Sequence, residues 1–108
     1  MQPLPVRFLP LAQTDLEDIY RFVAVTADNP RRAALFTDRI VDRAEKIGDA
    51  PYGGVARPDL GEGIRMVPFE KSAVILYTVG DEEVLVVNVF YGGKDYAAIL
   101  NAGPAATD

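Results

Sequence analysis

Gly63–Asp95, GIRMVPFEKSAVILYTVGDEEVLVVNVFYGGKD, holds the densest apolar runs of the chain and decides its fold. Within it, Ser72–Val79 and Val84–Tyr91 are rich in β-branched and aromatic residues, which is typical of strands. The polar tetrapeptide Gly80–Glu83 between them has the length and composition of a hairpin connection. We therefore predict two antiparallel strands, preceded by a third at Gly63–Phe69, in a three-strand meander.

The strand at Ser72–Val79 carries apolar side chains on both of its faces. Ala73, Ile75, Tyr77 and Val79 lie on one face, and Val74 and Leu76 lie on the other. Full burial of one large aliphatic side chain contributes roughly 1.5–3 kcal/mol, yet an isolated hairpin is at best marginally stable in water. The sheet therefore needs cover, and the N-terminal half must supply it. Because Pro68 has no N–H to donate, we predict that the first meander strand is an edge.

The N-terminal half is predicted to form a short strand and two helices. Val6–Leu9 lies between two prolines and alternates weakly, as a strand does. From Leu11 the sequence has a helical period. Thr14 with Glu17 has the spacing of a capping box, although Pro10 could equally open the helix a turn earlier. Asn29-Pro30 ends this helix and starts a second one, which stops at Gly48. The apolar stripes are Leu16, Ile19, Tyr20, Val23 and Ala27 in the first helix, and Ala33, Phe36, Ile40, Ala44 and Ile47 in the second.

Two segments remain outside these elements. Ala50–Glu62 is rich in proline and glycine and is expected to be a loop, while Asp95–Asn101 has the pattern of a short helix. Residues 102–108 are small and polar, and we expect a disordered tail. The prediction is a single α+β domain over residues 1–101, in the order β-α-α-β-β-β-α. In it, an antiparallel two-helix hairpin packs on an antiparallel sheet.

Composition excludes several kinds of chemistry. The 108 residues include neither Cys nor His, which excludes disulfides, thiolate or imidazole zinc sites, and Ser-His-Asp or Cys-His catalysis. Eleven Lys and Arg against sixteen Asp and Glu give a net charge of -5. Because nucleic-acid binding depends on neutralising phosphates, a protein partner is the more natural expectation. We found neither a membrane-span pattern nor a signal-peptide pattern, so we expect a cytoplasmic location.

The order of these elements resembles the RelE/ParE superfamily of toxins from prokaryotic toxin-antitoxin systems, and the local residues resemble its ParE branch. The pieces that carry the resemblance are AQTDLEDI at Ala12–Ile19, Asn29-Pro30 with Ala33 and Phe36, Pro51, Gly63-Ile64-Arg65, Ile75-Leu76-Tyr77, and VFYGGKD at Val89–Asp95. The resemblance covers residues 5 to about 101. It implies a non-enzymatic toxin that poisons DNA gyrase and is neutralised by a cognate ParD-like antitoxin, which lays an extended segment and an amphipathic helix along it.

Two alternatives stay open. The first is a ribosome-dependent mRNA endonuclease of the RelE type, and the second is a ParE-like domain that has lost toxicity. The RelE branch has basic residues on its sheet and a Tyr near its C-terminus, where this chain has Val67, Val74 and Leu100. Without His, RNA cleavage would rely on Arg65, Lys94 and nearby tyrosines to move protons and offset phosphate charge. These departures favour the gyrase poison.

The candidate site residues fall into two groups. Arg65, Lys94 and Tyr96 are predicted to contact the target, because Gly92-Gly93 lets the chain turn sharply after its last strand. The antitoxin is predicted to bind Leu16, Ile19, Tyr20, Phe22 and Val23 on the first helix. Arg65 could instead pair with an acid such as Asp95. We expect no catalytic residue, no metal and no cofactor. We interpret Asp15, Glu17 and Asp18 as negative charges in the first turn of the helix, where the helix dipole favours them.

Overall fold

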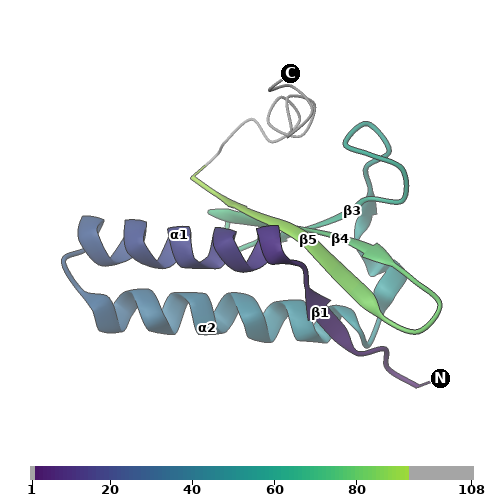
Figure 1. Cartoon of the computed structure of the whole chain (residues 1–108), viewed down its shortest axis with the longest axis horizontal. Coiled ribbons are helices and arrows are strands. Elements are labelled where there is room, and N and C mark those ends of the chain that lie inside the picture. The colour runs from purple at the N-terminus through teal and green to yellow at the C-terminus, as the bar shows by residue number, and fades with distance from the viewer. Residues whose placement is uncertain (1, 93–108) are drawn as a thin grey trace.

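Five strands form one sheet in the order β1-β5-β4-β3-β2, and two helices cover one of its faces (Figure 1). The computed structural model describes residues 2–92. Its elements are β1 (Val6–Phe8), α1 (Pro10–Thr26), α2 (Pro30–Ile47), the 3₁₀ helix η1 (Pro51–Gly53), β2 (Val55–Ala56), β3 (Arg65–Phe69), β4 (Ala73–Val79) and β5 (Val84–Tyr91). The predicted α+β class, helix hairpin and meander are confirmed. The predicted helix at 95–101 and the tail lie outside the described residues.

The N-terminal strand makes the sheet mixed rather than wholly antiparallel. β1 pairs with β5 in parallel, with Val6 opposite Val84, while the other three neighbouring pairs are antiparallel. β1 leads directly into α1, and the helix hairpin then carries the chain across the sheet to β2 at the opposite edge (Figure 1). The direction of β1 depends on this long connection, so its local sequence could not predict it.

The prediction that the first meander strand is an edge is wrong for its first half. Val55 and Ala56 of β2 pair with Met66 and Arg65 of β3, so β2 is the edge. Pro68 lies beyond the reach of this two-residue strand, in a part of β3 that pairs with β4 alone among residues 2–92. The position is therefore compatible with the missing N–H of proline.

Both helices begin at a proline. Pro10 is the first residue of α1, the earlier of the two predicted starts, and Asn29 caps α2 by accepting the N–H of Arg32 at 3.0 Å. Gly48 follows α2 as predicted, but its φ of -60° is ordinary. A Cβ at this position would collide with the carbonyl oxygen of Leu4, so glycine is required by close packing against the N-terminal segment.

The sheet has a hydrophobic core on each face. On the helix side, Ile75 and Tyr77 of β4 are fully buried against the stripes of both helices, of which the second is buried as predicted. On the other face, Leu76 is fully buried, and Leu60 from the β2–β3 loop packs beside it with Phe90 of β5. The two alternating apolar sets of β4 therefore serve two separate cores.

The Tyr77 hydroxyl connects the sheet to the turn that follows α2. It donates a hydrogen bond to the Pro51 carbonyl at 2.7 Å and accepts the Gly54 N–H at 3.0 Å. A Cβ on Gly54 would collide with this hydroxyl. The side chain of Tyr77 is thus a core residue, as the strand pattern suggested, and it also fixes the turn.

We predict that Tyr77→Phe lowers the free energy of unfolding by about 1–3 kcal/mol, since it leaves the Pro51 carbonyl and the Gly54 N–H without their partner. Tyr52→Phe is the matched control, because that ring is 68% exposed, and it should change stability by less than about 0.5 kcal/mol. Urea unfolding followed by circular dichroism measures both. Equal losses in the two variants would show that the Tyr77 hydroxyl does not stabilise the turn.

Candidate functional site

The outer end of the helix hairpin exposes apolar side chains that the core does not use. Of the five residues predicted to bind an antitoxin, Ile19 is buried in the core, and Leu16 and Val23 pack partly buried against it. Tyr20 and Phe22 are exposed, at 37% and 54%. Val25 and Leu35 add to this surface. The predicted stripe therefore divides into residues that hold the hairpin on the sheet and residues that a partner can reach.

Two hollows lie beside this exposed surface, and they share Tyr91 as a wall. The first has a volume of about 400 Å³ and is lined by Asp18, Ile19, Phe22, Tyr91 and Gly92. The second, of about 410 Å³, is lined by Val23, Arg32, Leu35, Phe36, Arg39, Glu70 and Tyr91. The Tyr91 ring stands edge-on to Phe22 and Phe36, with centroids 5.6 and 5.5 Å apart. The aromatic cluster gives both hollows an apolar wall.

An ion pair closes one side of the second hollow. The Arg39 guanidinium donates two hydrogen bonds to the Glu70 carboxylate, at 2.9 and 3.1 Å, and lies 5.5 Å from the Phe36 ring centroid. These hydrogen bonds hold the pKa of Glu70 below its usual range. Glu70 and Lys71 have φ angles of 48° and 61°, which non-glycine residues adopt uncommonly. Arg39 thus links α2 to a tight β3–β4 turn.

Arg65, predicted to contact the target, is bound to the turn after α2. Its guanidinium donates to the carbonyl oxygens of Tyr52 at 3.1 Å and Gly54 at 2.7 Å, and lies 5.1 Å from the Tyr52 ring centroid. Arg65 thus binds backbone carbonyl oxygens among the described residues. The acid that the sequence analysis considered as its partner, Asp95, lies outside them. The side chain is half-buried and supports the turn that Tyr77 also fixes.

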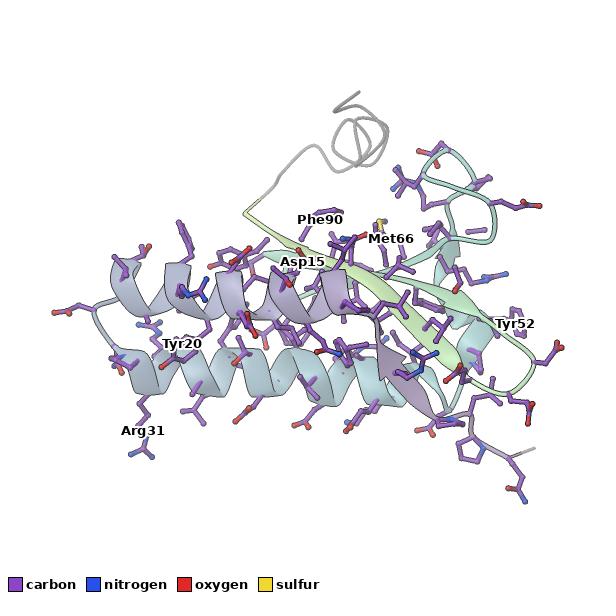
Figure 2. All side chains as sticks on the ribbon, in the orientation of Figure 1. Asp15, Tyr20, Arg31, Tyr52, Met66 and Phe90 are labelled. Carbon is purple, nitrogen blue, oxygen red and sulfur yellow. The ribbon has the colours of Figure 1, made fainter. Side chains whose placement is uncertain are left out.

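The structure does not bring Arg65 near the end of β5. Arg65 pairs with Tyr77, whereas Tyr91 pairs with Ala73, four residues away on the same strand. This separation amounts to about 13 Å along β4. Figure 2 places Tyr52, the aromatic partner of Arg65, at the opposite end of the molecule from Tyr20. The other two predicted target contacts, Lys94 and Tyr96, lie outside the described residues.

The face of the sheet away from the helices is apolar. Met66, Leu76 and Phe90 lie there, with Val74 and Val87 packed beside them. Figure 2 shows Met66 and Phe90 on this side of the sheet. Arg57 reaches this face through a contact of 3.3 Å with the Met66 sulfur, but Asp59 holds its guanidinium with hydrogen bonds of 3.0 and 2.8 Å. Within residues 2–92, no group of three or more His, Cys, Asp or Glu side chains could hold a metal ion.

Asp15 has a structural role that the sequence analysis missed. Its Oδ2 accepts the backbone N–H of Val89 at 2.9 Å and the side-chain amide of Asn88 at 3.1 Å. β1 pairs with β5 only up to Val86, and a bulge follows, so the Val89 N–H has no strand partner on that side. The first turn of α1, which begins at Pro10, contains no acidic residue. The interpretation of Asp15, Glu17 and Asp18 as first-turn charges is therefore wrong.

A family model described as the ParE toxin of the type II toxin-antitoxin system parDE matches residues 6–96. This chain belongs to the ParE toxin family. It is a toxin of a type II toxin-antitoxin system with the ParE/RelE fold. No curated protein matches this ParE sequence. Among residues 2–92, neither helix is long and apolar enough to cross a membrane.

Solved structures share the fold of this ParE-family chain at low sequence identity. A protein from the chromosomal ParDE toxin-antitoxin system of P. aeruginosa is 20% identical, with a TM-score of 0.72, and the match covers 82% of this chain and 96% of that one. A chain of the RelBE2 toxin-antitoxin complex from Mycobacterium tuberculosis is 21% identical, with a TM-score of 0.56, covering 83% and 99%. These likenesses establish the architecture.

We predict that the Glu70 carboxyl titrates below the usual glutamate pKa of about 4.3, and that Arg39→Gln returns its pKa to that value. Because the folded pKa is lowered, the ion pair stabilises the protein above about pH 4.3 and its contribution is lost as the pH falls through the folded pKa. Carboxyl NMR titration of both proteins measures this. An unchanged Glu70 pKa in Arg39→Gln would show that the pair does not form in solution.

Proposed function

We propose that this ParE-family toxin binds DNA gyrase and inhibits it without catalysing a covalent reaction, and that a cognate ParD-like antitoxin neutralises it. The family assignment over residues 6–96 carries the proposal. Two features of the chain support it: the hydrophobic core on the sheet face away from the helices, which leaves that face without gathered charges among residues 2–92, and the exposed apolar surface at the end of the helix hairpin.

The apolar sheet face argues against the RelE-type alternative. Cleavage of RNA through its 2′-hydroxyl needs groups that move protons and groups that offset the charge of the phosphate. The chain has no His, and Met66, Leu76 and Phe90 belong to a hydrophobic cluster on the sheet face away from the helices. Arg57 is held by Asp59 in a two-bond ion pair. The likeness to the RelBE2 structure concerns the fold and does not supply these groups.

The antitoxin is proposed to bind the exposed part of the helix hairpin. Tyr20 and Phe22 lie on the accessible side of α1, and Leu35 of α2 is 50% exposed. An amphipathic helix laid in an apolar groove is a common mode of peptide recognition, and the two hollows beside Tyr91 offer such grooves. Ile19, Leu16 and Val23 would support this surface from the core side.

The target contacts are proposed to be Lys94 and Tyr96, with Arg65 as a separate contact. Lys94 and Tyr96 follow Gly92, whose φ of 82° is a conformation that glycine adopts readily and that ends the extended backbone of β5. Arg65 lies at the other end of β4, half-buried beside the exposed Tyr52 ring. Arg65 is therefore tested by its own substitution, independently of Lys94 and Tyr96.

The test is supercoiling by purified gyrase in the presence of folded toxin. We expect the wild type to inhibit supercoiling and Lys94→Glu to lose inhibition by tenfold or more, because reversing the charge would place like charges together across the interface. Lys46→Glu is the control, since it makes the same change on the exposed side of α2. Supercoiling that proceeds normally at a large excess of folded wild-type toxin would exclude gyrase as the target.

A further inference from the structure

The two hollows beside Tyr91 form one surface with opposite charges at its ends. We call it the Tyr91 trough, and it is defined by the charged residues Asp18, Arg32, Arg39 and Glu70 with the apolar Phe22, Leu35 and Tyr91. Asp18 lines the hollow on the α1 side. Arg32 lines the hollow on the α2 side together with the Arg39–Glu70 ion pair, so Arg32 leaves that end with a net positive charge. Apolar side chains lie between them, with the Phe22 and Tyr91 rings in contact at the centre.

Arg32 is placed where it does not help the fold. It lies in the first turn of α2, which contains no acidic residue, so the positive charge adds to the positive end of the helix dipole. Among residues 2–92, its guanidinium makes no ion pair, although the backbone N–H of Arg32 is bound by Asn29. Arg31 shares this position at the start of the helix, but Arg32 also lines the hollow beside Tyr91.

The Asp18 carboxylate of the trough is held by a weak, exposed ion pair. Asp18 pairs with Arg21 at 3.2 Å, with both side chains more than 60% exposed. An exposed pair of this kind contributes little to stability, so a ligand cation can replace Arg21 at low cost. The Arg39–Glu70 pair has two hydrogen bonds and is expected to stay in place, which leaves Arg32 as the cation that a ligand carboxylate can reach.

We propose that the trough takes a segment of the antitoxin with a defined polarity of charge. The segment places apolar side chains beside Phe22, Tyr91 and Leu35, a carboxylate against Arg32, and a basic side chain against Asp18. This inference rests on the proposed antitoxin partner and adds the direction in which its segment lies. Charge complementarity of this kind sets the register of a bound segment and excludes segments of the reverse polarity.

Arg31 provides a matched control for the test. It is the preceding residue on the same turn of α2, it is subject to the same helix dipole, and its side chain points away from the sheet (Figure 2). Arg31→Glu and Arg32→Glu therefore make the same change in charge at nearly the same place, but only Arg32 lines the trough. Each variant is titrated by calorimetry with the purified protein encoded by the adjacent reading frame.

We expect Arg32→Glu to weaken binding by roughly tenfold and Arg31→Glu by less than about threefold, with the difference narrowing at high salt. Asp18→Lys should weaken binding as Arg32→Glu does. If the wild type binds and the two arginine variants weaken binding equally, the proposed charge polarity of the bound segment is wrong. The proposal that an antitoxin binds the toxin then still stands. If the folded wild type does not bind at all, the proposed antitoxin partner fails, and this inference fails with it.

A second measurement identifies what fills the trough. The sequence has no Cys, so Asp18→Cys introduces a single reactive thiol. We expect this thiol to react with maleimide in the free toxin and to be protected once the adjacent-frame protein is added. Protection in the free toxin that persists on dilution would assign the trough to another segment of the same chain, and protection lost on dilution to a second copy. Either result would overturn the proposal.

Discussion

Strand β4 is apolar on both faces, and the need to cover both arranges the rest of the protein. Ile75 and Tyr77 are buried beneath the two helices, and Leu76 is buried on the other face beside Leu60. The helix hairpin therefore lies flat on one face, and Phe22 of α1 contacts the Tyr91 ring at the end of β5. Tyr20 and Phe22 remain partly exposed there, so the surface proposed for the antitoxin follows from how the core is covered.

The same arrangement uses several cations for structure. Arg65 binds two carbonyl oxygens of the turn after α2, Arg57 is held by Asp59, and Arg39 links α2 to Glu70. The face opposite the helices is filled by apolar side chains. Within residues 2–92, this face of the sheet does not gather the charged groups that phosphate chemistry requires. This constraint is the physical reason for preferring a gyrase-binding toxin to a ribonuclease.

Sequence reasoning succeeded where a pattern is local. Polar residues bound the β-branched runs of β4 and β5, and Asn29-Pro30 separates the two helices, so these elements were predicted closely. It failed where partners are distant. β2 has only two residues and no pattern, the direction of β1 depends on the whole chain, and Asp15 binds Val89 across 74 positions. The helical period likewise identified the α1 stripe without separating buried Ile19 from exposed Phe22. Arg65 was assigned from its charge, whereas its bonds to the turn could only be seen in the fold.

The central claim is that this toxin acts by binding and does not cleave RNA. Primer extension on ribosomes programmed with mRNA tests it most directly, using folded toxin at concentrations that arrest growth. The account predicts intact mRNA, because Met66, Leu76 and Phe90 pack on this face of the sheet, and residues 2–92 bring no convergent acid, base and cation to it. Specific cleavage of the mRNA in the ribosomal A site would contradict the account and return the RelE-type mechanism to first place.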